Sequence, residues 1–287
     1  MTTVTPPPPP HETAPQGAVP PSPEGRPRRS APRVIAILTI VLGSAIILGT
    51  VLTAVFATLA VPFRQNHDAS LDVSGVTELR VDADATDLTI EFKDVDEASL
   101  RVVEGGRGPW RFDVEGDTLR VASPHRPFFG WLFGGNGRAT LTLPSELAGA
   151  DAALSLSAGS LTADGTFGEL ELDLSAGDLD VTGEAETLDL DVRAGRADID
   201  IADVTEASFG LSAGDTRARL TGSAPRAVSV DVSAGSLDLT VPDETYALRS
   251  DVSAGGLSTG SLRTDGSASR TISVDLSAGS VTIRGAD

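Results

Sequence analysis

Apolar and polar residues alternate along most of the chain from about residue 71. Clear runs are Leu88-Thr-Ile90-Glu-Phe92, Leu119-Arg-Val121 and Thr140-Leu-Thr-Leu-Pro144. A period of two is the spacing of a strand that buries one face. Turn-forming stretches at 104–109 and 134–137 separate the runs, and no amphipathic helix longer than two turns is convincing. The pattern predicts that residues 71–287 are all-β.

A tripeptide recurs through the second half of this region. Successive glycines of the tripeptide are 18, 18, 19, 21, 20 and 24 residues apart. Units of this length cannot bury their own apolar face, but stacked copies form one continuous core. The copies are Ser157–Gly159, Ser175–Gly177, Ser212–Gly214, Ser233–Gly235, Ser253–Gly255 and Ser277–Gly279, with Arg193-Ala194-Gly195 as a seventh that has one change.

The apolar alternation slips by one residue at each glycine. Before Gly177 the apolar positions are even-numbered (Leu170, Leu172, Leu174), and after it they are odd-numbered (Leu179, Val181). A slip of one residue would turn the next strand's apolar face outward unless the chain bends at glycine, where a positive φ carries no Cβ penalty. Each unit is therefore predicted to be strand, glycine corner, strand and turn. We expect the alanine to point inward at the corner and the serine hydroxyl to hydrogen-bond local backbone.

These units predict a β-solenoid of stacked 18–24-residue repeats with Ser-Ala-Gly corners over residues 151–287. Residues 71–150 are predicted to be an N-terminal β section that covers one end. An antiparallel β-sandwich built from hairpins is the alternative, but it gives no reason for every unit to turn at the same tripeptide.

The arrangement resembles the putative-adhesin family of β-strand-repeat domains in membrane-anchored bacterial envelope proteins. The resemblance rests on the repeated Leu/Val-x-Leu/Val-Ser-Ala-Gly-x-Leu/Val units and on the strand end Leu141-Thr-Leu-Pro144 before them. It covers about residues 71–287 and includes a degenerate first unit at Leu79–Phe92. The resemblance implies a fold and an envelope location, and it brings no catalytic residues with it. Twenty-one arginines against one lysine are also typical of an actinobacterial composition.

The first 70 residues follow a different pattern. Residues 1–33 are rich in proline, which fixes φ and removes a backbone donor, so they are predicted to be a disordered cytoplasmic tail. Val34 to Val61 is a run of 28 residues without an ionisable group, long enough for a transmembrane helix over 34–62, and 63–70 is a linker. A cleaved signal peptide is the alternative, although its apolar region is usually shorter. The tail is either a ligand for an aromatic groove or a solvated segment without a partner.

Composition and charge exclude several classes of function. The 287 residues carry 41 Asp plus Glu against 22 Lys plus Arg, a net charge of −19, which argues against nucleic acid as a partner. The absence of cysteine excludes a disulfide scaffold, a thiolate metal site and a cysteine nucleophile. Residues 1–63 have instead a net charge of +2, from Arg26, Arg28, Arg29 and Arg33 against Glu12 and Glu24. The positive-inside rule places this basic end in the cytoplasm and the β region outside.

No residue is predicted to be catalytic, to bind a cofactor or to hold a metal. The histidines, His11, His67 and His125, all lie outside the repeats, and no Gly-x-Ser-x-Gly elbow is present. Parallel β-helices host glycan-cleaving enzymes, so such an enzyme remains the cross-class alternative. The acidic residues, however, recur by repeat position and do not gather at one place.

Two features have competing interpretations. The position four before each glycine is Asp173, Asp191, Asp231, Asp251 and Asp275, with Ser155 and Gly210 in the other copies. This column is either a solvated face or a ladder for divalent cations. The aromatic residues Trp110, Phe112, Phe128, Phe129, Trp131 and Phe133 either plug the first rungs or anchor a partner or lipid surface.

The sequence thus predicts a single-pass membrane protein whose extracellular β-solenoid serves surface interaction, adhesion or envelope sensing without catalysis. A cell-wall polymer or an envelope protein is the expected partner. We also expect the last rung, Val281-Thr-Ile283, to be the open end of the stack, where end-on association with a second copy could occur.

Overall fold

The computed structural model describes residues 68–103, 109–124 and 137–286. All described residues belong to one unit of the chain, residues 60–287. Within residues 68–103, 109–124 and 137–286, no helix is long and apolar enough to cross a bilayer. The predicted tail 1–33, the predicted span 34–62 and the aromatic segment 128–133 lie outside the described residues.

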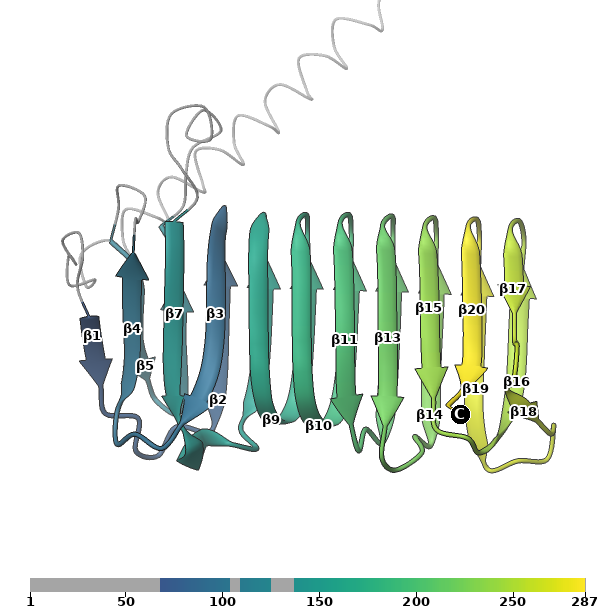
Figure 1. Cartoon of the computed structure of the whole chain (residues 1–287), viewed down its shortest axis with the longest axis horizontal. Coiled ribbons are helices and arrows are strands. Elements are labelled where there is room, and N and C mark those ends of the chain that lie inside the picture. The colour runs from purple at the N-terminus through teal and green to yellow at the C-terminus, as the bar shows by residue number, and fades with distance from the viewer. Residues whose placement is uncertain (1–67, 104–108, 125–136, 287) are drawn as a thin grey trace, which may run out of the picture. The chain divides into compact units, whose positions relative to one another are not determined.

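Two facing layers of strands make up this unit of the chain (Figure 1). The sheet that contains the strands following the Ser-Ala-Gly corners is here called the post-glycine sheet, and the sheet that contains the strands leading into these corners is called the pre-glycine sheet. The order in the post-glycine sheet is β1 (Asp68–Leu71), β4 (Ala98–Val103), β7 (Gly137–Pro144), β3 (Thr86–Lys93), the first half of β9 (Gly159–Leu174), the first half of β10 (Asp178–Val192), β11 (Arg196–Ala202), β13 (Asp215–Thr221), β15 (Ser236–Val241), β20 (Ser280–Gly285) and β17 (Gly256–Ser258).

The pre-glycine sheet has the matching order. It runs β5 (Arg111–Glu115), β6 (Thr118–Ala122), β2 (Glu78–Ala83), β8 (Asp151–Leu156), the second halves of β9 and β10, β12 (Glu206–Leu211), β14 (Ala227–Val232), β19 (Arg270–Leu276), β16 (Thr245–Val252) and β18 (Arg263–Thr264). A short 3-10 helix, η2 (Ser145–Leu147), follows β7. All pairings through the repeats are parallel, which excludes the sandwich of hairpins; the antiparallel pairs β1–β4, β4–β7 and β5–β6 lie toward the N-terminal end.

The core lies between the two sheets, and the predicted phase slip at glycine is confirmed. Leu170, Leu172 and Leu174 before the corner are at most 1% exposed, and Leu179 and Val181 after it are at most 2% exposed. Both sets therefore point into the same core although their numbering changes parity. The bend at glycine is what keeps the second strand's apolar face inward.

The corners stack glycine on glycine. Gly177 has φ +112°, and a Cβ at this position would lie 2.2 Å from the carbonyl oxygen of Gly159 in the preceding rung. Only glycine satisfies both the backbone angle and the close approach. The backbone N–H of Ser175 donates to the carbonyl of Leu156 at 2.9 Å, so main-chain groups bind one corner to the next.

The predicted roles of alanine and serine at the corner need correction. Ala176 and Ala234 are exposed, because the glycine makes the inward approach and the alanine lies at the tip of the turn. Among the described residues, the only hydrogen bond to a repeated serine hydroxyl is the one that Ser175 accepts from Arg193, at 3.3 Å.

The rungs do not stack in chain order at either end. The first rung in sequence, β2–β3, lies between β6–β7 and β8–β9. The last rung in sequence, β19–β20, lies between β14–β15 and β16–β17. The prediction that Val281 and Ile283 form the open end is therefore wrong, because both side chains are fully buried between two rungs. The terminal rung is β16–β17.

Candidate functional site

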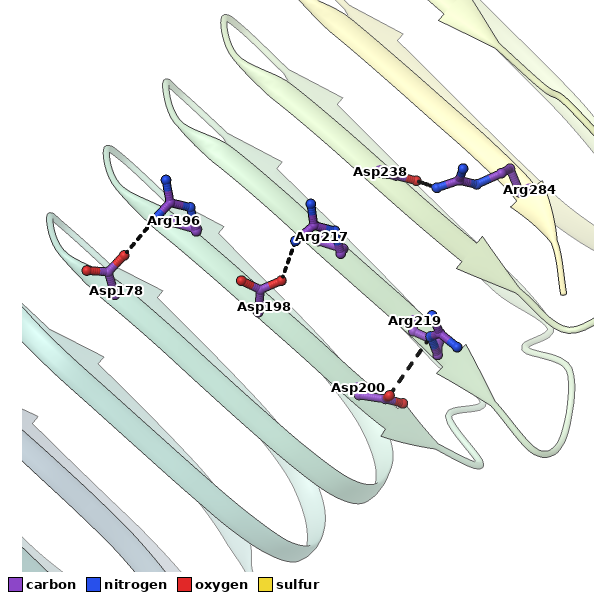
Figure 2. A network of polar contacts seen from close by, with 8 residues as sticks. All are labelled: Asp178, Arg196, Asp198, Asp200, Arg217, Arg219, Asp238 and Arg284. Carbon is purple, nitrogen blue, oxygen red and sulfur yellow. Dashed lines mark hydrogen bonds and ion pairs between the residues drawn. The ribbon is translucent and has the colours of Figure 1, made fainter.

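The outer face of the post-glycine sheet carries a ladder of opposite charges. Every second side chain of each strand points into the core, and the charged side chains occupy the alternate, outward-facing positions. Three pairs join residues directly opposite one another on neighbouring strands: Asp178–Arg196 at 3.4 Å, Asp198–Arg217 at 3.0 Å and Asp200–Arg219 at 3.9 Å. Figure 2 shows each carboxylate reaching toward the guanidinium of the next rung. The ladder thus runs along the stacking direction, at right angles to the strands.

A fourth pair extends this ladder diagonally. Arg284 on β20 contacts Asp238 on β15, although Asp238 lies directly opposite Thr282 (Figure 2). The side chains of all four pairs are 38–70% exposed. Exposed ion pairs contribute little to stability, so these pairs balance charge across the face more than they stabilise the fold.

A shallow groove of about 440 Å³ lies among these charges, across β11, β13, β15 and β20. Three carboxylates and two guanidinium groups line it: Asp198, Asp215, Asp238, Arg196 and Arg217. The hydroxyl groups of Ser236, Ser280 and Thr282 stand beside them, and Ser236 donates to Asp215. The groove therefore presents fixed donors and acceptors of both charges and little apolar surface, an arrangement suited to a polar, polyhydroxylated or charged polymer.

The ladder was not predicted from the sequence, although a signal was present. The residue after each corner glycine is Asp178, Arg196 and Asp215 in three successive units. Aligning the repeats one position beyond the glycine would have placed these alternating charges side by side.

The aspartate column itself is confirmed as a row on the outer face of the pre-glycine sheet. Its register is Ser155, Asp173, Asp191, Gly210, Asp231, Asp275 and Asp251 along successive strands. Arg193, the residue that replaces serine in the seventh corner, reaches back to Asp173. The altered tripeptide thus supplies a cation where two column aspartates lie on neighbouring rungs.

Burial and neighbouring charges both act on Asp191 in this column. Burial raises the pKa of Asp191, the neighbouring charges of Asp189 and Asp173 raise it further, and Arg193 opposes the shift. Within the described part of the chain, no three acidic or histidine side chains converge in a way that could hold a metal ion. The column is thus an exposed acidic row with one arginine beside Asp173 and a gap at Gly210, and its aspartates Asp231, Asp275 and Asp251 lie on successive neighbouring strands.

The structure also divides the aromatic cluster. Trp110 and Phe112 are 6% and 7% exposed and belong to the core at the N-terminal end, as the plug interpretation expects of them. Phe128, Phe129, Trp131 and Phe133 lie outside the described residues, as do the three histidines.

Comparison with known families decides which group of proteins this fold represents. The family described as Toastrack DUF4097 matches residues 76–251. The chain belongs to this family. The match spans the rungs from β2 to β16, and the predicted resemblance to adhesin-type β-repeat domains of undescribed function is confirmed.

Several solved structures resemble this Toastrack chain. A putative adhesin from Bacteroides fragilis shares 13% identity, with a TM-score of 0.43 over 78% of this chain and 98% of its own. A putative adhesin from Parabacteroides distasonis also shares 13% identity, with a TM-score of 0.41 over 77% and 97%. A putative lipid binding protein from the same species shares 13% identity, with a TM-score of 0.33 over 77% and 97%. No curated protein matches the sequence.

Proposed function

We propose that this Toastrack protein is a non-catalytic interaction module of the cell surface, anchored in the membrane by residues 34–62. The observation that carries the proposal is the polar groove of the post-glycine sheet, where rigid strands hold charges and hydroxyl groups at regular spacing. Repeating ligands suit such a face because successive rungs offer similar groups in successive places. A cell-wall polymer is therefore the favoured partner.

The groove can be tested with purified cell-wall material. Full-length protein in detergent is mixed with insoluble cell-wall sacculi and sedimented at low and high salt. The double variant Arg196→Ala with Arg217→Ala should lower the bound fraction severalfold. Arg226→Ala is the control, because Arg226 is an exposed arginine immediately before β14 of the pre-glycine sheet and pairs with Glu206 at 3.4 Å.

Two results would contradict the proposal. Equal binding by the double variant and the control would remove the groove from the interaction. Release of soluble sugar by the wild-type protein would replace the binding role with that of a glycan-cleaving enzyme.

The proposed orientation places the N-terminal tail in the cytoplasm and the β domain outside. It is supported by the net charge of +2 on residues 1–63 of a chain whose net charge is −19. Protease added to intact cells should remove an epitope tag after residue 287 and spare one before residue 1. Protection of the C-terminal tag would reverse the orientation and remove the surface role.

A further inference from the structure

Part of the outer edge of β16, in the terminal rung, has no neighbouring strand among the described residues. Strand β16 pairs with β19 from Tyr246 to Val252, but on its other side β18 covers Thr245 and Tyr246 alone. Beyond these residues the corner at Ser253 ends the strand. Among the described residues, the segment 248–252, hereafter the free edge, therefore has a partner on one side only.

The backbone groups of the free edge point away from the stack at alternate residues. The N–H of Ser253 donates to Leu276 of β19 at 2.9 Å, and the carbonyl of Tyr246 accepts from Asp265 on the opposite side at 2.9 Å. Because successive residues of a strand direct their backbone groups to opposite sides, Leu248, Ser250 and Val252 direct theirs outward. An unpaired row of this kind is a template for another strand.

The side chains of the free edge also differ from those of the inner rungs. Val252 continues the core-facing row of Val232 and Leu276, which are 0% and 2% exposed, yet it is 41% exposed. Arg249 and Asp251 are exposed on the outer face, and within the described chain neither forms an ion pair.

These five residues form a self-complementary series: apolar Leu248, cationic Arg249, Ser250, anionic Asp251 and apolar Val252. We propose that the free edge pairs with the same edge of a second copy, antiparallel, about a twofold axis at Ser250. In that register Arg249 faces Asp251 of the other copy, and Leu248 faces its Val252. The outward backbone groups of Ser250 meet those of its counterpart as a hydrogen-bonded pair.

The geometry favours a second copy over an unrelated strand. An isologous interface requires one patch that is complementary to itself, and antiparallel pairing of this segment with a second copy sets opposite charges against each other and apolar ends against apolar ends. The length of the free edge also suits pairing with a second copy. β18 bounds the segment at one end and the glycine corner bounds it at the other, so two identical segments pair over the same five residues. An interface of this size is small, so the association is expected to be weak and to depend on local concentration.

The absence of cysteine from the chain makes a direct test available. Ser250→Cys introduces a single thiol at the proposed axis, where the Cα atoms of a hydrogen-bonded pair lie about 5.5 Å apart, within the range that a disulfide spans. Full-length protein is oxidised mildly, and the disulfide-linked dimer is measured by non-reducing electrophoresis. Ser229→Cys is the control, because Ser229 is exposed on β14, two strands in from the edge of the same sheet.

We expect about tenfold more cross-linked dimer from Ser250→Cys than from Ser229→Cys. Adding Arg249→Asp to Ser250→Cys places like charges opposite each other and should return the yield to the control level. Adding Asp251→Arg as well exchanges the two charges and should restore the yield, a result that nonspecific collision does not give. Circular dichroism checks that each variant remains folded.

Equal cross-linking of the two single-cysteine variants would overturn the proposal, and so would a yield that the charge reversal leaves unchanged. Head-to-tail stacking through different edges would also overturn it, because Ser250 would then not meet its own counterpart. None of these results depends on the groove ligand.

Discussion

Replacing Gly235 with alanine should destabilise the domain far more than replacing a glycine outside the corner stack. The backbone of Gly235 has φ +118°, and an alanine Cβ there would lie 2.3 Å from the carbonyl oxygen of Gly214. That carbonyl already accepts the N–H of Ser236 at 2.9 Å. The substitution therefore introduces both backbone strain and a collision with a hydrogen-bonded main chain.

The two costs can be estimated separately. A non-glycine residue in the left-handed region costs roughly 1–2 kcal/mol. Relieving a contact this short requires the rungs to separate, and losing a buried backbone hydrogen bond costs about 1–3 kcal/mol. Gly235→Ala should therefore cost roughly 2–5 kcal/mol. A domain of this size loses about 2–4 °C of melting temperature per kcal/mol, so the decrease should be on the order of 10 °C.

A matched series separates strain from collision. Gly116 has φ +69°, and no atom lies within 4 Å of the point that an alanine Cβ would occupy, so Gly116→Ala tests strain alone and should cost about 1–2 kcal/mol. Gly256 lies next to a corner glycine, but its φ is not in the left-handed region and nothing lies within 4 Å, so Gly256→Ala should change little. Thermal unfolding followed by circular dichroism measures all three variants. If Gly235→Ala and Gly116→Ala lose the same melting temperature, stacking of the corners does not constrain the glycine.

Three further outcomes follow from the structure. Ile283→Asp should lower the melting temperature much more than Val252→Asp, because the side chains are 0% and 41% exposed; similar losses would contradict the inserted last rung. Asp191→Asn should stabilise the domain against urea at pH 7, because the raised pKa of Asp191 means that the fold disfavours its ionised form. The gain in stability should disappear below the pKa of the unfolded carboxyl group, about 4. The hydrogen bond from the Ser223 N–H lowers the pKa of Asp203, so Asp203→Asn should destabilise at pH 7, and the loss should shrink as the pH falls through that lowered pKa; a pH-independent loss would contradict the charge-based account.

The repeat allowed much of the fold to be predicted from sequence. The parity change at each glycine identified the core residues on both sides of the corner, and the constant tripeptide required parallel stacking. The aspartate column followed from the same spacing. The outward direction of the corner alanines could not be predicted from the repeat, because it depends on how closely the glycines of neighbouring rungs approach one another.

The order of the rungs at the ends could not be predicted from the alternation alone. A parallel rung offers the same apolar face to either neighbour, so β20 could lie beside β15 or beyond β17 without any change in pattern. One residue did carry a signal: Ser250 stands in the core-facing row that Val230 and Val274 occupy in the next rungs. A polar residue in that row marks the rung with no neighbour beyond it.

The inverted order at both ends has a physical consequence for a stacked domain. Terminal rungs have one neighbour and are the first to fray, above all where the chain can peel away from an end. Here the outer rung β16–β17 is connected at one side to β15 and at the other to β18 and β19, so it can open only as a loop whose two ends stay fixed. Toward the N-terminal end, the rung β6–β7 likewise lies in sequence between β2–β3 and β8–β9, the rungs that stack farther in. Closing an edge with an internal segment reduces the entropy gained on opening, so the chain connections stabilise a terminal rung whose outer strand keeps an exposed pairing edge.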